Sequence, residues 1–162
     1  MFDLSARFLL KGPYMLTDPT LPGYALSTDK QHLDVDMIHH FLSEESYWSR
    51  GVPRDVVERA VRHSMCFGVY HEGKQVGFGR VVTDHASFAL LADLFVIEGH
   101  RGRGISKWML RCIIDHEALQ GLRRWLLLTS DAHELYARFG FTPLGSPSRF
   151  MEVLRANIYA SA

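Results

Sequence analysis

Apolar residues change their spacing several times along this chain, and each change marks a predicted element. Residues 24–27 predict a short strand, and segment 34–42 places apolar residues at helical spacing behind Asp34, which suits an N-cap. Pro53 stands at a favourable first-turn position of a second helix, whose apolar face ends near His63. Two amphipathic helices are therefore expected in the first half of the chain.

The middle of the chain has the pattern of an antiparallel meander. Strands are predicted over residues 65–71 and 75–83, joined by a turn at residues 72–74. Residues 88–97 are almost continuously apolar except for Asp93, as expected of a central strand covered on both faces. This last segment is the best candidate for the core strand.

The last third begins with a loop and a long amphipathic helix. From Ile105 onward the apolar residues fall at helical intervals, which predicts a helix that runs to about Leu119 before Gly121 ends it. Residues 125–129 then predict another buried strand.

A short helix and a last strand are predicted near the C-terminus. Asp131 is a candidate N-cap, Glu134 follows at capping-box spacing, and Gly140 closes the helix. Residues 150–154 supply the last strand. Together these elements predict an α+β, or mixed α/β, three-layer fold: a twisted, mostly antiparallel sheet of about six or seven strands flanked by about four helices.

Length and composition add a single domain to this picture. The chain has 162 residues, 47% of them hydrophobic, which suits one well-buried core and is too short for two. We therefore expect one domain over residues 1–162. Residues 1–22 resist a packed assignment because glycine and proline interrupt them, and they predict an irregular or mobile N-terminal arm.

Charge excludes two classes of partner. The chain has 18 Lys and Arg against 18 Asp and Glu, so no overall field would collect nucleic acid or an anionic membrane. No apolar run approaches the ~18 residues of a membrane span and no export leader is visible, so a cytoplasmic location is expected. Cys66 and Cys112 lie within apolar segments and predict buried, reduced thiols.

The loop between the central strand and the long helix is the strongest candidate site. Gly102 and Gly104 let the backbone turn tightly with exposed amides, and the next helix adds unsatisfied donors and a partial positive charge. Arg101 and Arg103 can add charge-assisted contacts to phosphate oxygens. A turn that merely uses glycine is the alternative. The spacing excludes a Walker loop, and Lys107 stands where the dinucleotide fingerprint needs its third glycine.

Two segments resemble the motifs of the GNAT acetyltransferases. Residues 101–106, Arg-Gly-Arg-Gly-Ile-Ser, resemble the family's Arg/Gln-x-x-Gly-x-Gly/Ala loop, with Ser106 in place of glycine or alanine. Residues 129–141 are similar to the family's Asn-x-x-Ala-x-x-Leu-Tyr-x-x-x-Gly-Phe segment, with Thr129 in place of asparagine. Because the motifs also occur in the family's order, the chain is identified as a member from about residue 66 to residue 152.

The resemblance implies a GNAT fold and an N-acetyltransferase that uses acetyl-CoA and no metal. It implies that the strand containing Leu94 pairs with the pantetheine arm and helps to polarise the thioester carbonyl. By position, Tyr136 corresponds to the family's proton donor to the coenzyme sulfur, although a core tyrosine is the alternative. The implied cofactor-binding residues are Leu94, Phe95, Val96, Arg101, Gly102, Arg103, Gly104, Ile105, Ser106, Thr129 and His133.

The general base is less clear than the acid. Asp93 is the best single candidate, because it lies in the buried strand before the expected acyl site. Asp84 and His85 sit at a turn, and His133 is near the expected coenzyme. Asp93 can instead pair with an arginine such as Arg80, and ordered water can remove the amine proton without a dedicated side chain.

Acceptor binding is expected in the loop that carries Tyr47 and Trp48. Their aromatic faces can hold a cationic amine. Arg50 and Arg54 argue instead for an acceptor that carries a carboxylate. Simple packing of the two aromatic rings between the first two helices is an equal alternative. The favoured acceptor is the primary amine of a small molecule or amino acid.

One rival from another class is a non-catalytic acyl-CoA-binding or regulatory module with the same fold; the intact Tyr136 weighs against it. The nine histidines show no metalloprotease spacing, which argues against metal catalysis. No nucleic-acid reader motif is present. The resemblance also allows a homodimer, with exposed parts of the last strand at its interface.

Overall fold

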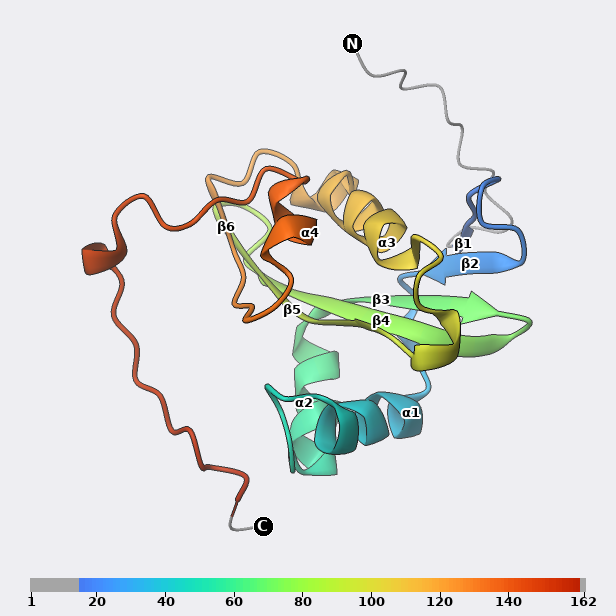
Figure 1. Cartoon of the computed structure of the whole chain (residues 1–162), viewed down its shortest axis with the longest axis horizontal. Helices are drawn as coiled ribbons and strands as arrows, with labels where there is room; N and C mark the ends of the chain where they lie inside the picture. The colour runs from blue at the N-terminus through green and yellow to red at the C-terminus, as the bar shows by residue number, and fades with distance from the viewer. Residues whose placement is uncertain (1–14, 161–162) are drawn as a thin grey trace.

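Six strands form one sheet in the order β1-β2-β3-β4-β5-β6, so each strand lies beside its neighbour in the sequence (Figure 1). The computed structural model describes residues 15–160. Neighbouring strands are antiparallel except β5 and β6, which are parallel. The strands are β1 (Met15–Leu16), β2 (Tyr24–Ser27), β3 (Met65–His71), β4 (Lys74–Thr83), β5 (Phe88–Val96) and β6 (Arg124–Leu126).

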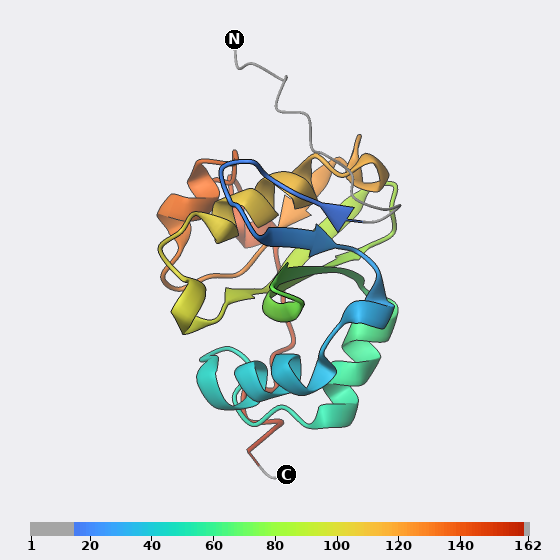
Figure 2. The same ribbon diagram turned by 90° about the vertical axis from the view of Figure 1, so that its right-hand side faces the viewer.

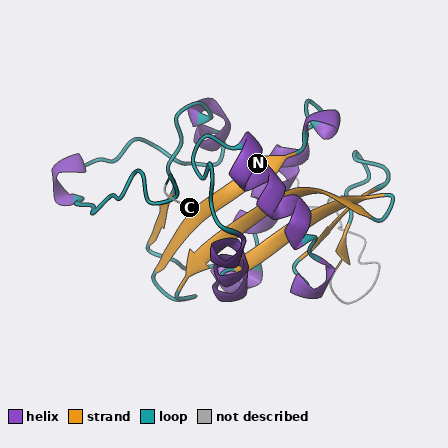
Figure 3. Ribbon diagram, turned by 90° about the horizontal axis from the view of Figure 1, so that it is seen from below, coloured by secondary structure: helices purple, strands orange, loops and turns teal. Residues whose placement is uncertain are grey.

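Helices cover both faces of this sheet. One face carries α1 (Val35–His40), its π-helical continuation η2 (Phe41–Glu45) and α2 (Arg54–His63), and the other carries α3 (Ile105–Ile114) and α4 (His133–Ala137) (Figures 1 and 2). Figure 3 shows the twisted strands behind the α1 and α2 layer. The predicted three-layer α+β arrangement is confirmed. Short 3-10 turns are η1 (Lys30–His32), η3 (Glu98–His100), η4 (Glu117–Leu119) and η5 (Pro147–Arg149).

The apolar core has two halves, one on each face of the sheet. On the α3 side, Trp108, Met109 and Ile113 are buried in one cluster with strand residues such as Phe67 and Val69. On the α1 and α2 side, a second cluster contains Ile38, Phe41, Leu42, Val57, Val61, Phe78 and Phe95. β4 and β5 contribute to both clusters, as the apolar run of residues 88–97 predicts for a strand covered on both faces.

Local signals place the first elements well. The Asp34 carboxylate accepts a hydrogen bond from the Met37 amide at 2.9 Å, which confirms the predicted N-cap of α1. Pro53 is the N-cap of α2 and not a first-turn residue, so the helix begins at Arg54, one residue later than predicted. Burial raises the pKa of the Cys66 thiol to about 11 and that of Cys112 to about 12, and both are free and buried, as predicted.

α3 is shorter than its apolar spacing predicts. It ends at Ile114, and the separate turn η4 follows. The His116 ring accepts a hydrogen bond from the Ala118 amide at 3.2 Å, so that side chain caps a new turn instead of continuing the helix. The expected run to Leu119 therefore combines two elements.

The last third of the chain departs most from the predictions. β6 ends at Leu126 instead of residue 129, and Ala132, not Asp131, is the N-cap of α4, without a side-chain cap. The strand predicted over residues 150–154 is wrong: Met151 is 98% exposed and Val153 94% exposed. A strand needs a paired neighbour, and this segment leaves the sheet, so local β propensity does not decide its structure.

The predicted N-terminal arm is only partly within the described residues. Residues 1–14 lie outside them, while Met15 and Leu16 pair with Ser27 and Leu26 in the sheet. Within residues 15–160, no helix is long and apolar enough to cross a membrane. The cellular location stays a prediction.

A β-bulge interrupts the central strand at Asp93. Phe78 pairs with Phe95 and Arg80 with Ala92, so β5 has one residue more than β4 between these pairs. Asp93 is that extra residue, and its φ of 51° lies in the left-handed region that aspartate tolerates better than most residues. The bulge lets the alternation of apolar residues continue on both sides of a single polar position.

Gly79 provides the space opposite this bulge. A Cβ at Gly79 would lie 2.9 Å from Leu94 Cδ1 and 3.5 Å from Ile113 Cδ1 of α3. A Cβ at Gly77 would meet the Phe95 carbonyl oxygen at 3.2 Å. These two glycines therefore permit close packing against the neighbouring strand and α3.

We expect Gly79→Val to lower the free energy of unfolding by about 1–3 kcal/mol, because the added side chain overlaps Leu94 and the α3 face. Urea unfolding followed by circular dichroism measures this change. Gly145→Val is the matched control, since a Cβ at Gly145 meets nothing within 4 Å. Equal losses in the two variants would contradict the close packing.

Candidate active site

β5 and its parallel neighbour β6 separate after the first third of β5. β6 pairs only with Phe88, Ala89 and Leu90, while β5 continues to Val96. The second half of β5 therefore has an edge without a strand partner on the β6 side. Such an edge offers backbone donors and acceptors to an extended ligand arm.

The loop after β5 has the geometry of an anion cradle. Gly102 and Gly104 have φ angles of 76° and 85°, and a Cβ at either would meet nothing within 4 Å, so the space above both is open. Gly104 is the N-cap of α3, whose first-turn amides have no partner within the helix. The predicted combination of a tight glycine turn and a helix N-terminus is present.

The two arginines of this loop, Arg101 and Arg103, have different surroundings. Arg101 Nε donates to the Val96 carbonyl at 2.8 Å and its guanidinium lies 6.0 Å from the centre of the Phe41 ring, which anchors the loop to the strand. Arg103 is exposed and forms no ion pair among the described residues. Arg103 is therefore the freer cation for an anionic ligand.

A polar contact fastens the turn just before the loop. The Tyr24 hydroxyl and His100 Nδ1 are 2.7 Å apart, and the His71 and His100 rings are 5.2 Å apart. Partial burial, and after it the neighbouring His71 and Arg103, lowers the pKa of His100. The lowered pKa favours the neutral ring, which serves as a hydrogen-bonding anchor.

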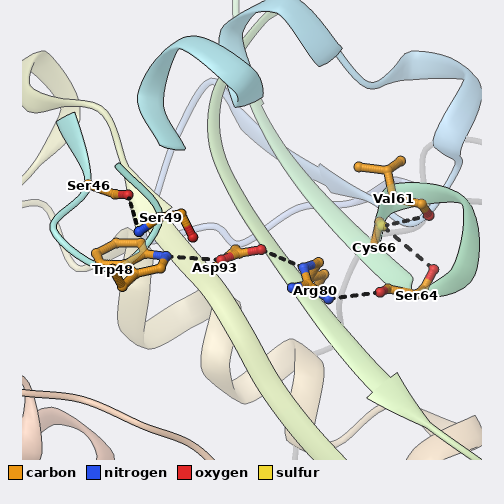
Figure 4. A network of polar contacts seen from close by, with 8 residues as sticks. All are labelled: Ser46, Trp48, Ser49, Val61, Ser64, Cys66, Arg80 and Asp93. Atoms are coloured by element: carbon orange, nitrogen blue, oxygen red, sulfur yellow. Dashed lines mark hydrogen bonds and ion pairs between the residues drawn. The ribbon is translucent and has the colours of Figure 1, made fainter. Parts of the chain in front are cut away.

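Asp93 joins three segments of the chain through its carboxylate. Trp48 Nε1 donates to Oδ1 at 2.9 Å, and Arg80 Nε donates to Oδ2 at 2.5 Å (Figure 4). Arg80 Nη1 also donates to Ser64 Oγ at 3.1 Å. Both carboxylate oxygens thus have partners, and one of the partners is the arginine that the sequence suggested.

A small pocket of about 210 Å³ lies where β5 and β6 part. Its walls come from the 47–48 loop, from the β5 bulge and from the loop that leads into α4. Six of the predicted site residues meet there: Tyr47, Trp48, Asp93, Leu94, Thr129 and Tyr136. The full lining is Tyr47, Trp48, Leu90, Leu91, Ala92, Asp93, Leu94, Leu128, Thr129, Asp131, Ala132 and Tyr136.

The Tyr47 hydroxyl closes the pocket across the strand gap. It accepts a hydrogen bond from the Ser130 amide at 3.1 Å and donates to Asp131 Oδ1 at 3.3 Å. The Tyr47 and Trp48 rings meet edge to face at 5.0 Å, and both remain exposed at the pocket. Simple packing between the first two helices therefore does not describe this pair.

Tyr136 lies half-buried between the small pocket and a larger cavity of about 1060 Å³ beside the C-terminal segment. Burial, with nearby Tyr47 and Asp131 adding to it, raises the pKa of the Tyr136 phenol to about 12. The phenol is therefore protonated across the neutral and mildly alkaline range, and it can donate a hydrogen bond there.

The remaining predicted residues are not all at the pocket. Phe95 is in the core, stacked on Phe41 with ring centres 3.8 Å apart, and Ile105 is buried in the opposite core. His133 lines only the larger cavity. Thr129 lines both, but its hydroxyl oxygen also accepts from the Ala132 amide at 3.1 Å. For the two core residues, only the backbone can face a ligand.

Comparison with known proteins connects this geometry to a family. A sequence model described as an acetyltransferase (GNAT) domain matches residues 62–143. A protein of Gibberella zeae named "Putative acetyltransferase FG08082" is 36% identical over 141 residues, which cover 74% of this chain and 78% of that protein. The chain belongs to the GNAT acetyltransferase family.

Solved structures agree with this GNAT assignment. The crystal structure of a GNAT-family protein from Xanthomonas campestris pv. campestris is 47% identical, with a TM-score of 0.84, over 86% of this chain and 99% of the other. An acetyltransferase from Clostridium acetobutylicum, described with acetyl-CoA, is 14% identical with a TM-score of 0.59, over 81% of this chain and 94% of the other. The second likeness concerns the fold alone.

One pocket residue of this GNAT chain received a different interpretation from its sequence. Asp131 lies in the second family motif, where its spacing to Glu134 favoured a capping box. In the structure the Thr129 hydroxyl accepts a hydrogen bond from the Ala132 amide in the turn before α4. Asp131 faces the pocket beside Tyr47. The position of Asp131 follows from the contact between the 47–48 loop and the loop before α4. The sequence alone does not show that these two loops meet.

The ion pair of Arg80 and Asp93 should be important for stability, because the side chains are only 20% and 9% exposed. We expect Arg80→Met to lower the free energy of unfolding by about 2–3 kcal/mol, since it leaves a carboxylate without its counter-charge. In the double variant Arg80→Met/Asp93→Asn the loss should be smaller than the sum of the single losses by at least about 1 kcal/mol. Urea unfolding of the four proteins measures the coupling, and additive losses would contradict it.

Proposed function

We propose that this GNAT acetyltransferase transfers the acetyl group of acetyl-CoA to the primary amine of a small molecule by direct attack on the thioester. One observation carries the proposal: Tyr136, Asp93 and the aromatic pair line one pocket beside the unpaired edge of β5. The phosphate cradle begins at the end of the same strand. A single extended thioester can therefore reach both places.

The chain fits the pyrophosphate and the pantetheine arm of the coenzyme. The pyrophosphate would lie on the amides of residues 102–106, with Arg103 as the free cation. The pantetheine amides would pair with the edge of β5 from Leu94 to Val96, where the backbone has no β6 partner. The open space above Gly102 and Gly104 supports close approach of a phosphate to the backbone.

The reaction needs one proton donor and one proton acceptor. The neutral amine nitrogen bonds to the thioester carbon, the carbon–sulfur bond breaks, and the products are an N-acetylamine and a thiol. Tyr136 donates a hydrogen bond to the departing sulfur and supplies its proton, and the proton lost by the amine restores the phenol. An ordinary thiol, with a pKa of ~8.5, is a stronger acid than this phenol. The phenol therefore first stabilises the developing thiolate through a hydrogen bond. Its proton moves to the sulfur as the amine is deprotonated.

Asp93 fits orientation of the amine better than proton removal. Protonation would cancel its charge and leave Arg80 without a counter-ion in partly buried surroundings, which is costly. The carboxylate has lone pairs beyond those used by Arg80 and Trp48, so it can still accept an N–H from the acceptor. We propose that ordered water takes the amine proton, and the predicted role of Asp93 as the base stays the alternative.

Release of free thiol from acetyl-CoA tests the proposal against the non-catalytic rival. The screen uses amino acids, diamines, aminoglycosides, arylalkylamines and peptide N-termini as acceptors. We expect release with at least one of these amines and a product heavier by one acetyl group in mass spectrometry. Tight binding of acetyl-CoA without release for any amine would favour the regulatory module.

Gly102→Asp and Gly104→Asp should each weaken acetyl-CoA binding at least about a hundredfold, because a carboxylate would face the pyrophosphate. Isothermal titration calorimetry measures the affinity. Gly121→Asp is the matched control, since Gly121 also has a positive φ and open space around a Cβ but lies beyond the other end of α3. Unchanged affinity in the folded loop variants would remove the loop from the site.

Tyr136→Phe should lower kcat about a hundredfold and leave the Kd of acetyl-CoA unchanged, because only the leaving thiolate loses a donor. Tyr70→Phe is the control, since the buried Tyr70 hydroxyl has no hydrogen-bond partner among the described residues. The raised pKa of Tyr136 also predicts that the native enzyme keeps its kcat up to about pH 10, where an ordinary phenol is half ionised. Equal kcat in native enzyme and Tyr136→Phe would exclude Tyr136 from the mechanism.

A further inference from the structure

The acceptor side of the pocket carries negative charge and aromatic surface. Its ionisable carboxylates are Asp93 and Asp131, and neither lysine nor arginine is among its lining residues. Arg80, which does not line the pocket, forms an ion pair with Asp93 and balances its charge. Asp131 is exposed, and among residues 15–160 its side chain has only hydroxyl partners, Tyr47 at 3.3 Å and Thr129 at 3.4 Å. Within the described part of the chain, one carboxylate of the pocket is therefore without a counter-charge.

The arginines that would favour a carboxylate-bearing acceptor are engaged elsewhere. Arg50 Nη2 donates to the Glu44 carbonyl at 3.2 Å. Arg54 forms ion pairs with Asp36 and Glu58 on the outer side of α2. Neither arginine lines the pocket. A carboxylate in this pocket would meet Asp131 and find no cation.

A positively charged acceptor would find the opposite conditions. Tyr47 and Trp48 are 55% and 42% exposed, so their ring faces are accessible to an ammonium group at the pocket. Asp131 adds a charge of opposite sign beside them. The volume of about 210 Å³ is below the ~300 Å³ at which drug-sized ligand sites begin, so the body of the acceptor is small.

From these contacts we infer that the acceptor is a small cationic amine without a carboxylate, recognised by Tyr47, Trp48 and Asp131. The inference rests on the proposed transfer to an amine, because it concerns the acceptor side of the same pocket. Asp131 is a specificity residue in this arrangement: it attracts the ammonium form from solution and repels carboxylates. The amine loses its proton before it attacks, beside the thioester and away from the rim that Asp131 occupies.

Amine and amino-acid pairs that differ only by a carboxylate test the inference. The acceptors are tyramine with tyrosine, histamine with histidine, and agmatine with arginine, at saturating acetyl-CoA. We expect kcat/KM to be at least about tenfold higher for the amine than for its amino acid in each pair that reacts. Preference for the amino acids would overturn the inference and leave the transferase intact. Absence of reaction with every amine of the earlier screen would remove the proposed function and the inference with it.

Asp131→Asn separates the role of this carboxylate from general damage. We expect the ratio within each pair to fall to less than about threefold, while the Kd of acetyl-CoA measured by calorimetry is unchanged. Glu134→Gln removes the same charge from an exposed residue of α4 that does not line the pocket, and it should keep the native ratio. Arg50→Gln should also keep it. A native ratio in Asp131→Asn, or loss of amino-acid turnover in Arg50→Gln, would overturn the assignment.

Discussion

The carboxylate of Asp93 binds Arg80 of β4 on one oxygen and Trp48 of the 47–48 loop on the other. The bulge in β5 makes this possible, because its extra residue takes a left-handed conformation without changing the apolar alternation on either side. An ion pair across β4 and β5 thus also fixes a loop that lies far away in the sequence. This interaction anchors the aromatic wall of the pocket to the sheet.

Separation of β5 from β6 supplies the other condition for function. The two strands pair for three residues and then part. Beyond Leu90 the backbone groups of β5 have no β6 partner and can pair with a ligand arm. The small pocket lies where the two strands separate. The loop at residues 101–106 follows the same strand, so the proposed sites of phosphate binding and acyl transfer lie along one continuous element. The proposed coenzyme and acceptor sites therefore both adjoin β5.

The electrostatics of the pocket distribute the chemical roles. Burial keeps the Tyr136 phenol protonated, which suits a donor to a departing thiolate. The pairing of Asp93 with Arg80 favours orientation, whereas Asp131 has the unpaired charge that a cationic acceptor would neutralise. The roles proposed for the two carboxylates of this pocket therefore differ because their partners differ.

Sequence patterns alone predict the meander of residues 65–97, the Asp34 cap, the glycine loop and the family motif around Tyr136. These features depend on the spacing of apolar residues, on local hydrogen bonds and on the φ angles that glycine can adopt. All three are properties of residues that are close together in the sequence. Contacts between distant segments are needed to explain the bulge at Asp93, the position of Arg50 and Arg54 outside the pocket, and the exposure of residues 151–154. Each of these depends on which distant segment supplies a partner, and one-dimensional patterns do not record such contacts.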